Sequence, residues 1–347
     1  MGRRTPITLA AMAGDSPRRD SDWEGVRLHV VTGKGGTGKT TVAAALALAL
    51  SGHGRRTLLV EVEGRQGIAQ LFDVPPLPYE ERKVATGAGG GDVHALAVDP
   101  EDALLEYLDM FYRLGRAGRG LRRMGAIDFA TTIAPGMRDV LLTGKVYEAV
   151  RRRTDGRSGP HVYDAVVLDA PPTGRITRFL AVNAEVSGLA KVGPIRNQAD
   201  SIMSLLTSPQ TAVHLVTLLE EMPVQETTDA AAELVAAGLP LGGVVVNSVR
   251  EPQLKVADLT AARRGTLPRG EVEAGLAAAG LKVRDPAVDA LLVEVAEHAE
   301  RVALEKSERR VLRGLGRPTY ELPLLPEGVD LGGLYLLAER LREQGAA

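Results

Sequence analysis

A glycine-rich stretch near the start of the chain combines the residue types that hold phosphate. Residues 33–40 read GKGGTGKT and fit the pattern G-x-x-x-x-G-K-[ST] without deviation. Glycines let successive backbone N–H groups surround an anion, and the dipole of a following helix favours negative charge there. Lys39 is expected to reach the β and γ phosphates of a nucleotide, and the Thr40 hydroxyl to bind Mg²⁺. The stretch therefore predicts a Mg-ATP site, the alternative being a glycine-rich turn that holds no ligand.

An acidic residue that could complete this site ends a later apolar run. The stretch VYDAVVLDAPPTG, residues 162–174, stops being apolar at Asp169. A carboxylate in this position holds Mg²⁺ in many nucleotide-hydrolysing enzymes. We expect Thr40 and Asp169 to form the metal site, with ATP and Mg²⁺ as cofactors. The loop residues expected to bind the nucleotide are Gly33, Lys34, Gly35, Gly36, Thr37, Gly38, Lys39, Thr40 and Thr41.

These residues need a sheet that brings the ends of distant strands together. Helical stretches separate most of the strand-like runs, and such alternation indicates a parallel sheet covered on both faces. The predicted fold class is α/β, a mostly parallel twisted sheet with helices on both faces plus a helical insertion. The runs that read as strands are residues 27–32, 55–64, 92–99, 162–169, 211–218, 241–249 and 317–325.

The length of 347 residues predicts one large domain with an insertion, or two domains, because single cores seldom grow further. Residues 1–25 read as a disordered tail; a twin-arginine export signal is the alternative, but the apolar part is too short. Residues 26–345 form the predicted ATPase domain. Helical periodicity predicts an insertion at about 100–160 and a second helical region at about 250–315.

Composition excludes several kinds of site. The formal net charge is −2 with 25% charged residues, so binding of nucleic acid through a strong positive field is not expected. The chain has no cysteine, which excludes disulfides and thiolate metal sites, and its six histidines lack ligand spacing. No apolar run approaches the roughly 20 residues that span a bilayer, and we expect a cytoplasmic protein.

The second lysine of the loop, Lys34, makes the pattern more specific. GKGGTGKT resembles the deviant phosphate loop of partition, nitrogenase-iron-protein and arsenite-pump ATPases. In those families the early lysine crosses a dimer interface and touches the nucleotide of the facing subunit. The resemblance implies that Lys34 supplies a cation in trans, as an arginine finger does. The alternative is a solvated loop lysine.

The stretch after Asp169 resembles one branch of that group. Residues 169–180 read DAPPTGRITRFL, similar to the second switch, D-x-x-P-T-G-x-x-x-R-F-L, of arsenite-pump and tail-anchored-protein-targeting ATPases. Downstream, TLLEEMPVQET and VVVN resemble segments of that family, which implies that Glu220 contacts the nucleotide and Asn247 the adenine. The resemblance covers about residues 27–345. It looks strongest to the paired anion-transporting ATPases of actinobacteria.

This resemblance implies a nucleotide-driven dimer, either a homodimer or a heterodimer with a paralogous ATPase. A protein client or a membrane-protein partner is also implied. Without cysteine, the chain cannot use the thiolate metalloid site of the arsenite pumps or the C-x-x-C zinc clamp of eukaryotic targeting ATPases. No zinc is therefore expected. Arginines at helical spacing within residues 113–123 form either a basic face for an acidic partner or lipid, or a solvated face.

One departure concerns the first switch. The family reads D-P-A-H there, and its aspartate orients the attacking water, whereas this chain places Glu63 at that position. The extra methylene moves the carboxylate, and a misplacement of about 1 Å can cost roughly 10²-fold in rate. Glu61 points to the same side by strand alternation and is a reserve candidate; alternatively both are surface carboxylates. The catalytic set is Lys34, Lys39 and Glu63, in either an ATPase or a weakly hydrolysing, ATP-dependent dimerisation switch or chaperone-like subunit.

Overall fold

The computed structural model describes residues 22–112, 136–156, 158–189, 194–281 and 284–347. Most of the predicted tail and the basic stretch 113–123 lie outside these residues. Trp23 belongs to the predicted tail, yet its ring packs edge-on against that of His214 at 4.9 Å between centroids. Tyr320 also donates a hydrogen bond to Asp22 at 2.7 Å. The end of the predicted tail is therefore packed against the sheet.

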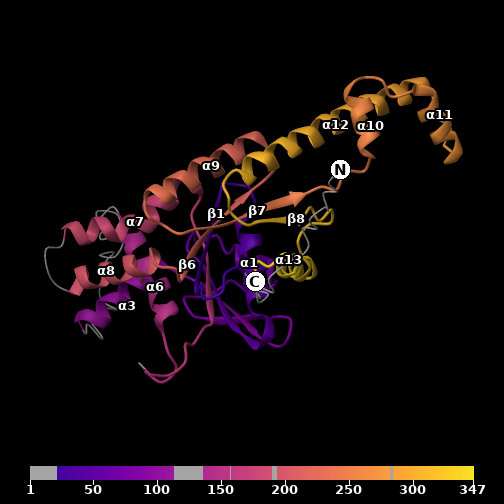
Figure 1. The fold of residues 1–347 in the computed structure, drawn as a ribbon. Helices are drawn as coiled ribbons and strands as arrows, with labels where there is room; N and C mark the ends of the chain where they lie inside the picture. The colour runs from indigo at the N-terminus through magenta and orange to yellow at the C-terminus, as the bar shows by residue number, and fades with distance from the viewer. Residues whose placement is uncertain (1–21, 113–135, 157, 190–193, 282–283) are drawn as a thin grey trace, which may run out of the picture.

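One mixed sheet organises the described chain (Figure 1), in the strand order β3-β4-β2-β5-β1-β6-β7-β8. Its neighbouring strands pair in parallel except at β3–β4, which confirms the predicted α/β class. The strands are β1 (Leu28–Gly33), β2 (Arg56–Glu61), β3 (Arg82–Thr86), β4 (Asp92–Ala97), β5 (Ala165–Asp169), β6 (Thr211–Thr217), β7 (Leu241–Val249) and β8 (Thr319–Pro323).

Strand β3 is the one that the sequence reading missed. It lies at the edge of the sheet, antiparallel to β4, and none of its five residues is fully buried. An exposed edge strand needs no apolar run, so its sequence RKVAT carries little of the signal that marked the other strands. The glycine-rich stretch after it forms the turn of this hairpin, with Gly87 donating to the Gly91 carbonyl at 2.7 Å.

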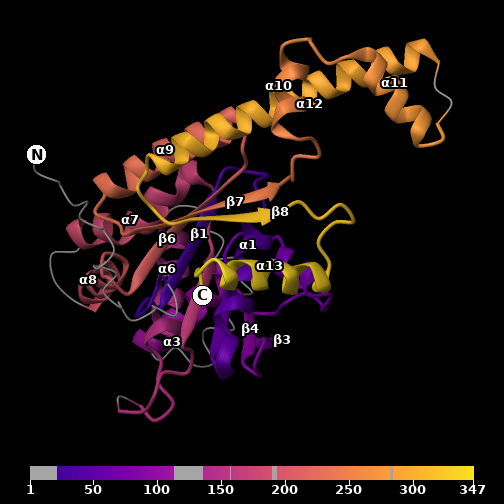
Figure 2. The same cartoon turned by 45° about the vertical axis from the view of Figure 1, so that its right-hand side comes forward.

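Helices cover both faces of the sheet (Figure 2). One face packs against α1 and α13, and the other against α6, α7, α8 and α9. The helices are α1 (Lys39–Leu50), α2 (Gly67–Leu71), α3 (Pro100–Tyr112), α6 (Met137–Arg151), α7 (Thr173–Leu189), α8 (Pro194–Leu206), α9 (Glu221–Ala236), α10 (Val256–Arg263), α11 (Arg269–Ala278), α12 (Asp285–Arg313) and α13 (Leu331–Glu343).

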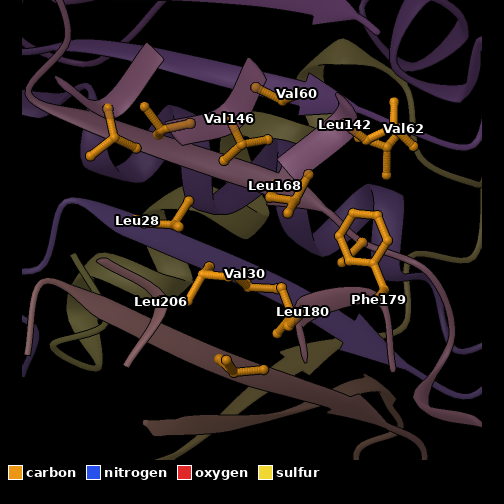
Figure 3. Close-up of a cluster of buried hydrophobic side chains, with 14 of the residues drawn as sticks. Leu28, Val30, Val60, Val62, Leu142, Val146, Leu168, Phe179, Leu180 and Leu206 are labelled. Atoms are coloured by element: carbon orange, nitrogen blue, oxygen red, sulfur yellow. The ribbon is translucent and has the colours of Figure 1, made fainter. Parts of the chain in front are cut away.

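The two cores follow from the alternation of side chains along the central strands. In β1, Leu28 and Val30 point to the core beneath α6, α7 and α8, whereas Val31 points to the core beneath α1. Figure 3 shows the first of these cores, where Phe179 of α7 lies near Leu168 of β5. Because helices cover both faces, the central strands β1, β5 and β6 are buried along their whole length and largely apolar, as expected for a parallel sheet.

Helix α12 extends well beyond the sheet. Its 29 residues give a length of about 44 Å at 1.5 Å per residue. One end runs beside α9, and the other carries α10 and α11 away from the sheet (Figures 1 and 2). A small core at Leu259, Ala262 and Ala299 joins α10 to α12. Within the described residues, no helix combines the length and apolar character needed to cross a membrane.

Candidate functional site

The phosphate-loop pattern lies between a central strand and a helix of the sheet. Strand β1 is flanked by β5 and β6 and ends at Gly33, and helix α1 begins at Lys39. Gly36 and Gly38 have φ angles of 87° and 84°, in the left-handed region that glycine adopts without strain. The described structure thus supplies the strand, loop and helix that the pattern requires.

One side of the loop packs against residues of strands β6 and β7. A Cβ on Gly33 would lie 2.2 Å from the Val216 carbonyl oxygen, and one on Gly38 would lie 2.3 Å from Asn247 Nδ2. Asn247 donates from Nδ2 to the Thr37 carbonyl oxygen at 3.0 Å. The Val216 carbonyl leaves no room for a side chain at Gly33, and the φ of 84° favours glycine at position 38.

The outer side of the loop is open. A Cβ added at Gly35 or Gly36 would meet no other atom within 4 Å. Inside the loop, the Thr37 hydroxyl donates to the Lys34 carbonyl oxygen at 2.9 Å, which closes the turn. Rigid backing and an open face are what a backbone anion site requires. The loop thus has both features of a backbone anion site.

The two predicted metal ligands are in contact. Thr40 lies in the first turn of α1, and its hydroxyl donates to Asp169 Oδ2 at 2.7 Å. Asp169 is the last residue of β5 and the register partner of Val31 in β1, which places it beside the loop. A hydroxyl and a carboxylate are oxygen ligands of the kind that Mg²⁺ prefers. These residues fit a magnesium ion.

The charges around Asp169 also favour a cation. The pKa of Asp169 is raised to about 6, mainly by burial and also by the carboxylates of Glu61 and Glu63, while the Thr40 hydrogen bond and the Lys39 charge oppose the rise. Burial likewise lowers the pKa of Lys39, with Arg65 adding to the effect and the carboxylates of Asp169 and Glu63 opposing it. A divalent cation at Asp169 would relieve the cost of ionising its buried carboxylate.

The two acidic residues of the first switch have different surroundings. Glu61 is only 2% exposed and accepts a hydrogen bond from the Ile68 N–H at the start of α2, at 3.3 Å. It is therefore not a surface carboxylate. The Glu63 side chain is 19% exposed and lies 3.5 Å from Arg65 and 3.9 Å from Arg175. Two cations thus contact the carboxylate that the sequence marks as the water-orienting group.

The arginines near Glu63 are not among the site residues predicted from the sequence. Arg65 follows it in the same loop, Arg138 belongs to α6 and Arg175 to α7. Together with Glu63 and Asp139 they line a cavity of about 220 Å³. Arg175 stands within the family-like stretch DAPPTGRITRFL, so its position in that motif was the available signal.

Lys34 is engaged within its own chain. Its ammonium Nζ lies 2.8 Å from Glu226 Oε1 on α9, and the side chains are 30% and 37% exposed. Lys34 thus has an acidic partner in its own chain, and its contact in trans stays a prediction. Glu220 is the N-cap residue of α9; it is exposed, and its side chain makes no capping hydrogen bond. Both acidic residues therefore lie at the start of α9, near the end of β6.

A larger cavity, of about 380 Å³, lies elsewhere in the described structure, among residues of α3, α6 and α8. Within it, Glu106 accepts hydrogen bonds from Tyr79 at 2.5 Å and from Lys145 at 2.8 Å. The residues that line it do not include the glycine-rich loop. The size of a cavity therefore does not identify the functional site. The residues suited to bind phosphate and magnesium lie at the loop after β1.

Several known proteins that this chain resembles in sequence are named as ATPases. A family model described as anion-transporting ATPase matches residues 26–210. A putative ATPase of Mycobacterium bovis and the ATPase BagA of Mycobacterium tuberculosis are each 56% identical over 98% of this chain and 99% of their own. The ATPase GET3 of Kluyveromyces lactis is 25% identical over 63% of this chain and 71% of its own. A putative arsenical pump-driving ATPase of Prosthecochloris vibrioformis is 26% identical over 66% and 62%.

Proposed function

The chain belongs to the anion-transporting ATPase family, and from that premise we propose that it is a Mg-ATP-dependent dimer that couples ATP binding and hydrolysis to a partner or client protein. The family membership predicted from the phosphate loop and the second switch is confirmed. That the chain is an ATP-binding ATPase follows from the family. The dimer, its coupling and the roles of individual residues are the proposal.

The proposed binding of MgATP rests on the loop and its neighbours. The backbone N–H groups of residues 33–38 and the start of α1 surround the phosphates, and Lys39 supplies the positive charge within the loop. Thr40 and Asp169 hold the metal ion, which neutralises charge on the β and γ phosphates when bound. Glu220 and Asn247 stay predicted nucleotide contacts, and Asn247 also braces the loop through Thr37.

Hydrolysis needs a group that orients water, and Glu63 is the proposed one. Its carboxylate lies 3.5 Å from Arg65 and 3.9 Å from Arg175, and contact with two cations competes with its contact to a water molecule. This supports a second candidate function, in which the chain binds ATP as a dimerisation switch or as a chaperone-like subunit of a heterodimer and hydrolyses it weakly. The two differ in turnover and share the binding site.

The second switch provides a route from the nucleotide to a partner surface. Asp169 ends β5, and α7 begins four residues later at Thr173. Helix α7 packs against α6, α8 and α9, so a displacement of its first turn would be transmitted through buried side chains such as Phe179. We propose that this helical layer carries the client or partner surface. The relatives named for arsenical pumping do not imply thiolate chemistry here, since this chain has no cysteine.

The observation that carries the proposal is the contact of Thr40 with Asp169 at 2.7 Å beneath a complete phosphate loop. The test is release of inorganic phosphate from ATP and Mg²⁺ by the purified chain, alone and mixed with its paralogous ATPase. Lys39→Ala should abolish nucleotide binding and turnover. Lys34→Ala should retain ATP binding but lose dimerisation and turnover.

A matched control is Lys306→Ala, which removes an exposed lysine of α12 far along the chain from the loop. It should behave as the unsubstituted chain. Equal turnover in Lys39→Ala and the unsubstituted chain would overturn the proposal. Tight ATP binding with negligible phosphate release, alone and with the paralogue, would favour the dimerisation switch. Mass measurement of the same samples separates homodimer from heterodimer.

A further inference from the structure

The ammonium group of Lys34 has two candidate partners, Glu226 in its own chain and the nucleotide of a facing subunit. The ion pair with Glu226 joins the phosphate loop to α9 of the same chain, at 2.8 Å. The proposed function requires the same ammonium to reach the nucleotide of a facing subunit. The carboxylate of Glu226 and the facing triphosphate would then compete for the same ammonium. Contact with Glu226 therefore opposes contact in trans.

Glu226 is held in place by the packing of α9. The buried residues of this helix lie on one side and include Val224, Thr227 and Leu234. Thr227 also donates from its hydroxyl to the Pro223 carbonyl oxygen at 2.7 Å. This buried side fixes the rotation of the helix about its axis, so Glu226 is presented beside the loop rather than reaching it by chance. Gly33 and Val216 are register partners in β1 and β6, which brings the start of α9 next to the loop.

We propose that Glu226 is a positioning residue that retains Lys34 within its own chain until a dimer forms. The inference rests on the proposed function in trans of Lys34. An ammonium bonded to Glu226 is withheld from the phosphates of either subunit. Dimer closure transfers it from the carboxylate to the triphosphate opposite, so closure depends on a competition between two anions for one cation.

The contact is weak enough to be reversible. Both side chains are about one third exposed, and ion pairs of that kind have small, salt-screened energies. Each pair should therefore shift the dimerisation equilibrium by about two- to threefold. A homodimer breaks two such pairs, which gives a combined effect of about four- to tenfold. Glu226 thus sets the protein concentration at which ATP closes the dimer.

The first test measures the contact without requiring a dimer. Lysine acylation by an N-hydroxysuccinimide ester, read residue by residue by mass spectrometry, reports how free the Lys34 ammonium is. In the full chain without nucleotide, Glu226→Gln should raise the Lys34 labelling rate by about two- to threefold, with Lys306 as the internal reference. Glu221→Gln removes the same charge from the first turn of α9 and should leave the rate unchanged.

The second test measures the consequence. With a non-hydrolysable ATP analogue and Mg²⁺, Glu226→Gln should dimerise at about four- to tenfold lower protein concentration than the unsubstituted chain or Glu221→Gln. The difference should shrink as NaCl is raised from about 0.05 to 0.5 M, because salt screens the pair. Circular dichroism melting checks that both variants are folded.

The outcomes separate the two proposals. Unchanged labelling of Lys34 in Glu226→Gln overturns the assignment of Glu226, even if ATP drives dimerisation. Faster labelling without tighter dimerisation of a chain that dimerises with ATP overturns its positioning role. Failure of ATP to produce a dimer, alone or with the paralogue, overturns the proposed function instead, because the labelling test does not depend on it.

Discussion

Glu61 and Asp169 are register partners at the carboxyl ends of the parallel strands β2 and β5. Both are nearly buried, at 2% and 8% exposure, so two carboxylates lie side by side in a region of low dielectric constant. Such an arrangement disfavours the ionised state of Asp169, whose pKa is raised to about 6. The buried carboxylates thus lower the stability of the chain without metal, and the same negative charge favours binding of a divalent cation.

Replacing Asp169 with asparagine should stabilise the chain at neutral pH in the absence of Mg²⁺ and nucleotide. The folded-state pKa of about 6 exceeds the usual 3.8, so the folded chain binds the proton more tightly. Stability contributed by this group is therefore lost as pH rises from about 3.8 to about 6. Asp169→Asn should be about 3 kcal/mol more stable at pH 7.5 and gain little at pH 4.

Urea unfolding at the two pH values measures this difference. Asp164→Asn is a poor control, because that carboxylate accepts a backbone hydrogen bond from Arg56. Asp258→Asn, at an exposed position of α10, serves better and should show no pH-dependent gain. A destabilised Asp169→Asn at pH 7.5 would contradict the account of the site as a region of carboxylate repulsion.

A buried histidine pair should make the fold sensitive to acid. His29 Nδ1 lies 3.1 Å from His214 Nε2, and the Gly243 N–H donates to His214 Nδ1 at 3.1 Å, which fixes neutral rings. Burial lowers the pKa of His29 to about 4. The unfolded chain binds its proton nearer pH 6.5, so stability is lost as pH falls from about 6.5 to 4.

This loss should reach about 2 kcal/mol for His29 by pH 5. His29→Gln should lower the stability at pH 7 but reduce its fall between pH 7 and pH 5, as followed by urea midpoints. His53→Gln, at an exposed position, should keep the full acid dependence. If His29→Gln shows the same fall as the unsubstituted chain, the buried pair is not the source of acid sensitivity.

Replacing each of two glycines of the phosphate loop with alanine should have different effects on stability. Gly33→Ala would put a Cβ 2.2 Å from the Val216 carbonyl oxygen, in the backbone of β6, which cannot move aside. We expect a loss of about 1–3 kcal/mol in the free energy of unfolding. Gly35→Ala meets no atom within 4 Å and should leave that free energy within about 0.5 kcal/mol. Equal stabilities of the two variants, measured without nucleotide, would refute the backing of the loop by β6.

Shortening Glu63 should change turnover. Glu63→Asp withdraws the carboxylate from Arg175 and Arg65 and restores the length that the resembled family uses. We expect the rate of phosphate release to rise by roughly tenfold or more, since errors of about 1 Å in position are costly. The rate with saturating ATP and Mg²⁺ is the measurement, and Glu294→Asp on α12 is the control. A fall in rate would mean that the glutamate is matched to its arginine-lined cavity.

Local patterns were sufficient for much of this protein. The order GKGGTGKT, its position between an apolar run and a helix, and the apolar run that ends at Asp169 all follow from short-range chemistry. Buried strands and long helices can be predicted from the spacing of apolar residues, because burial on one or two faces determines which positions are apolar. The exposed edge strand β3 has no such requirement and was missed.

Relationships between distant residues needed the folded chain. The register that pairs Glu61 with Asp169, the convergence of Arg138 and Arg175 on Glu63, and the approach of Glu226 to Lys34 join residues that are 75 to 192 positions apart. No local periodicity encodes such distances, because they depend on strand order and on how each helix packs against the sheet. Lys34 could be recognised as unusual from its neighbours in sequence, but its partner within the chain is set by the packing of α9 beside β1.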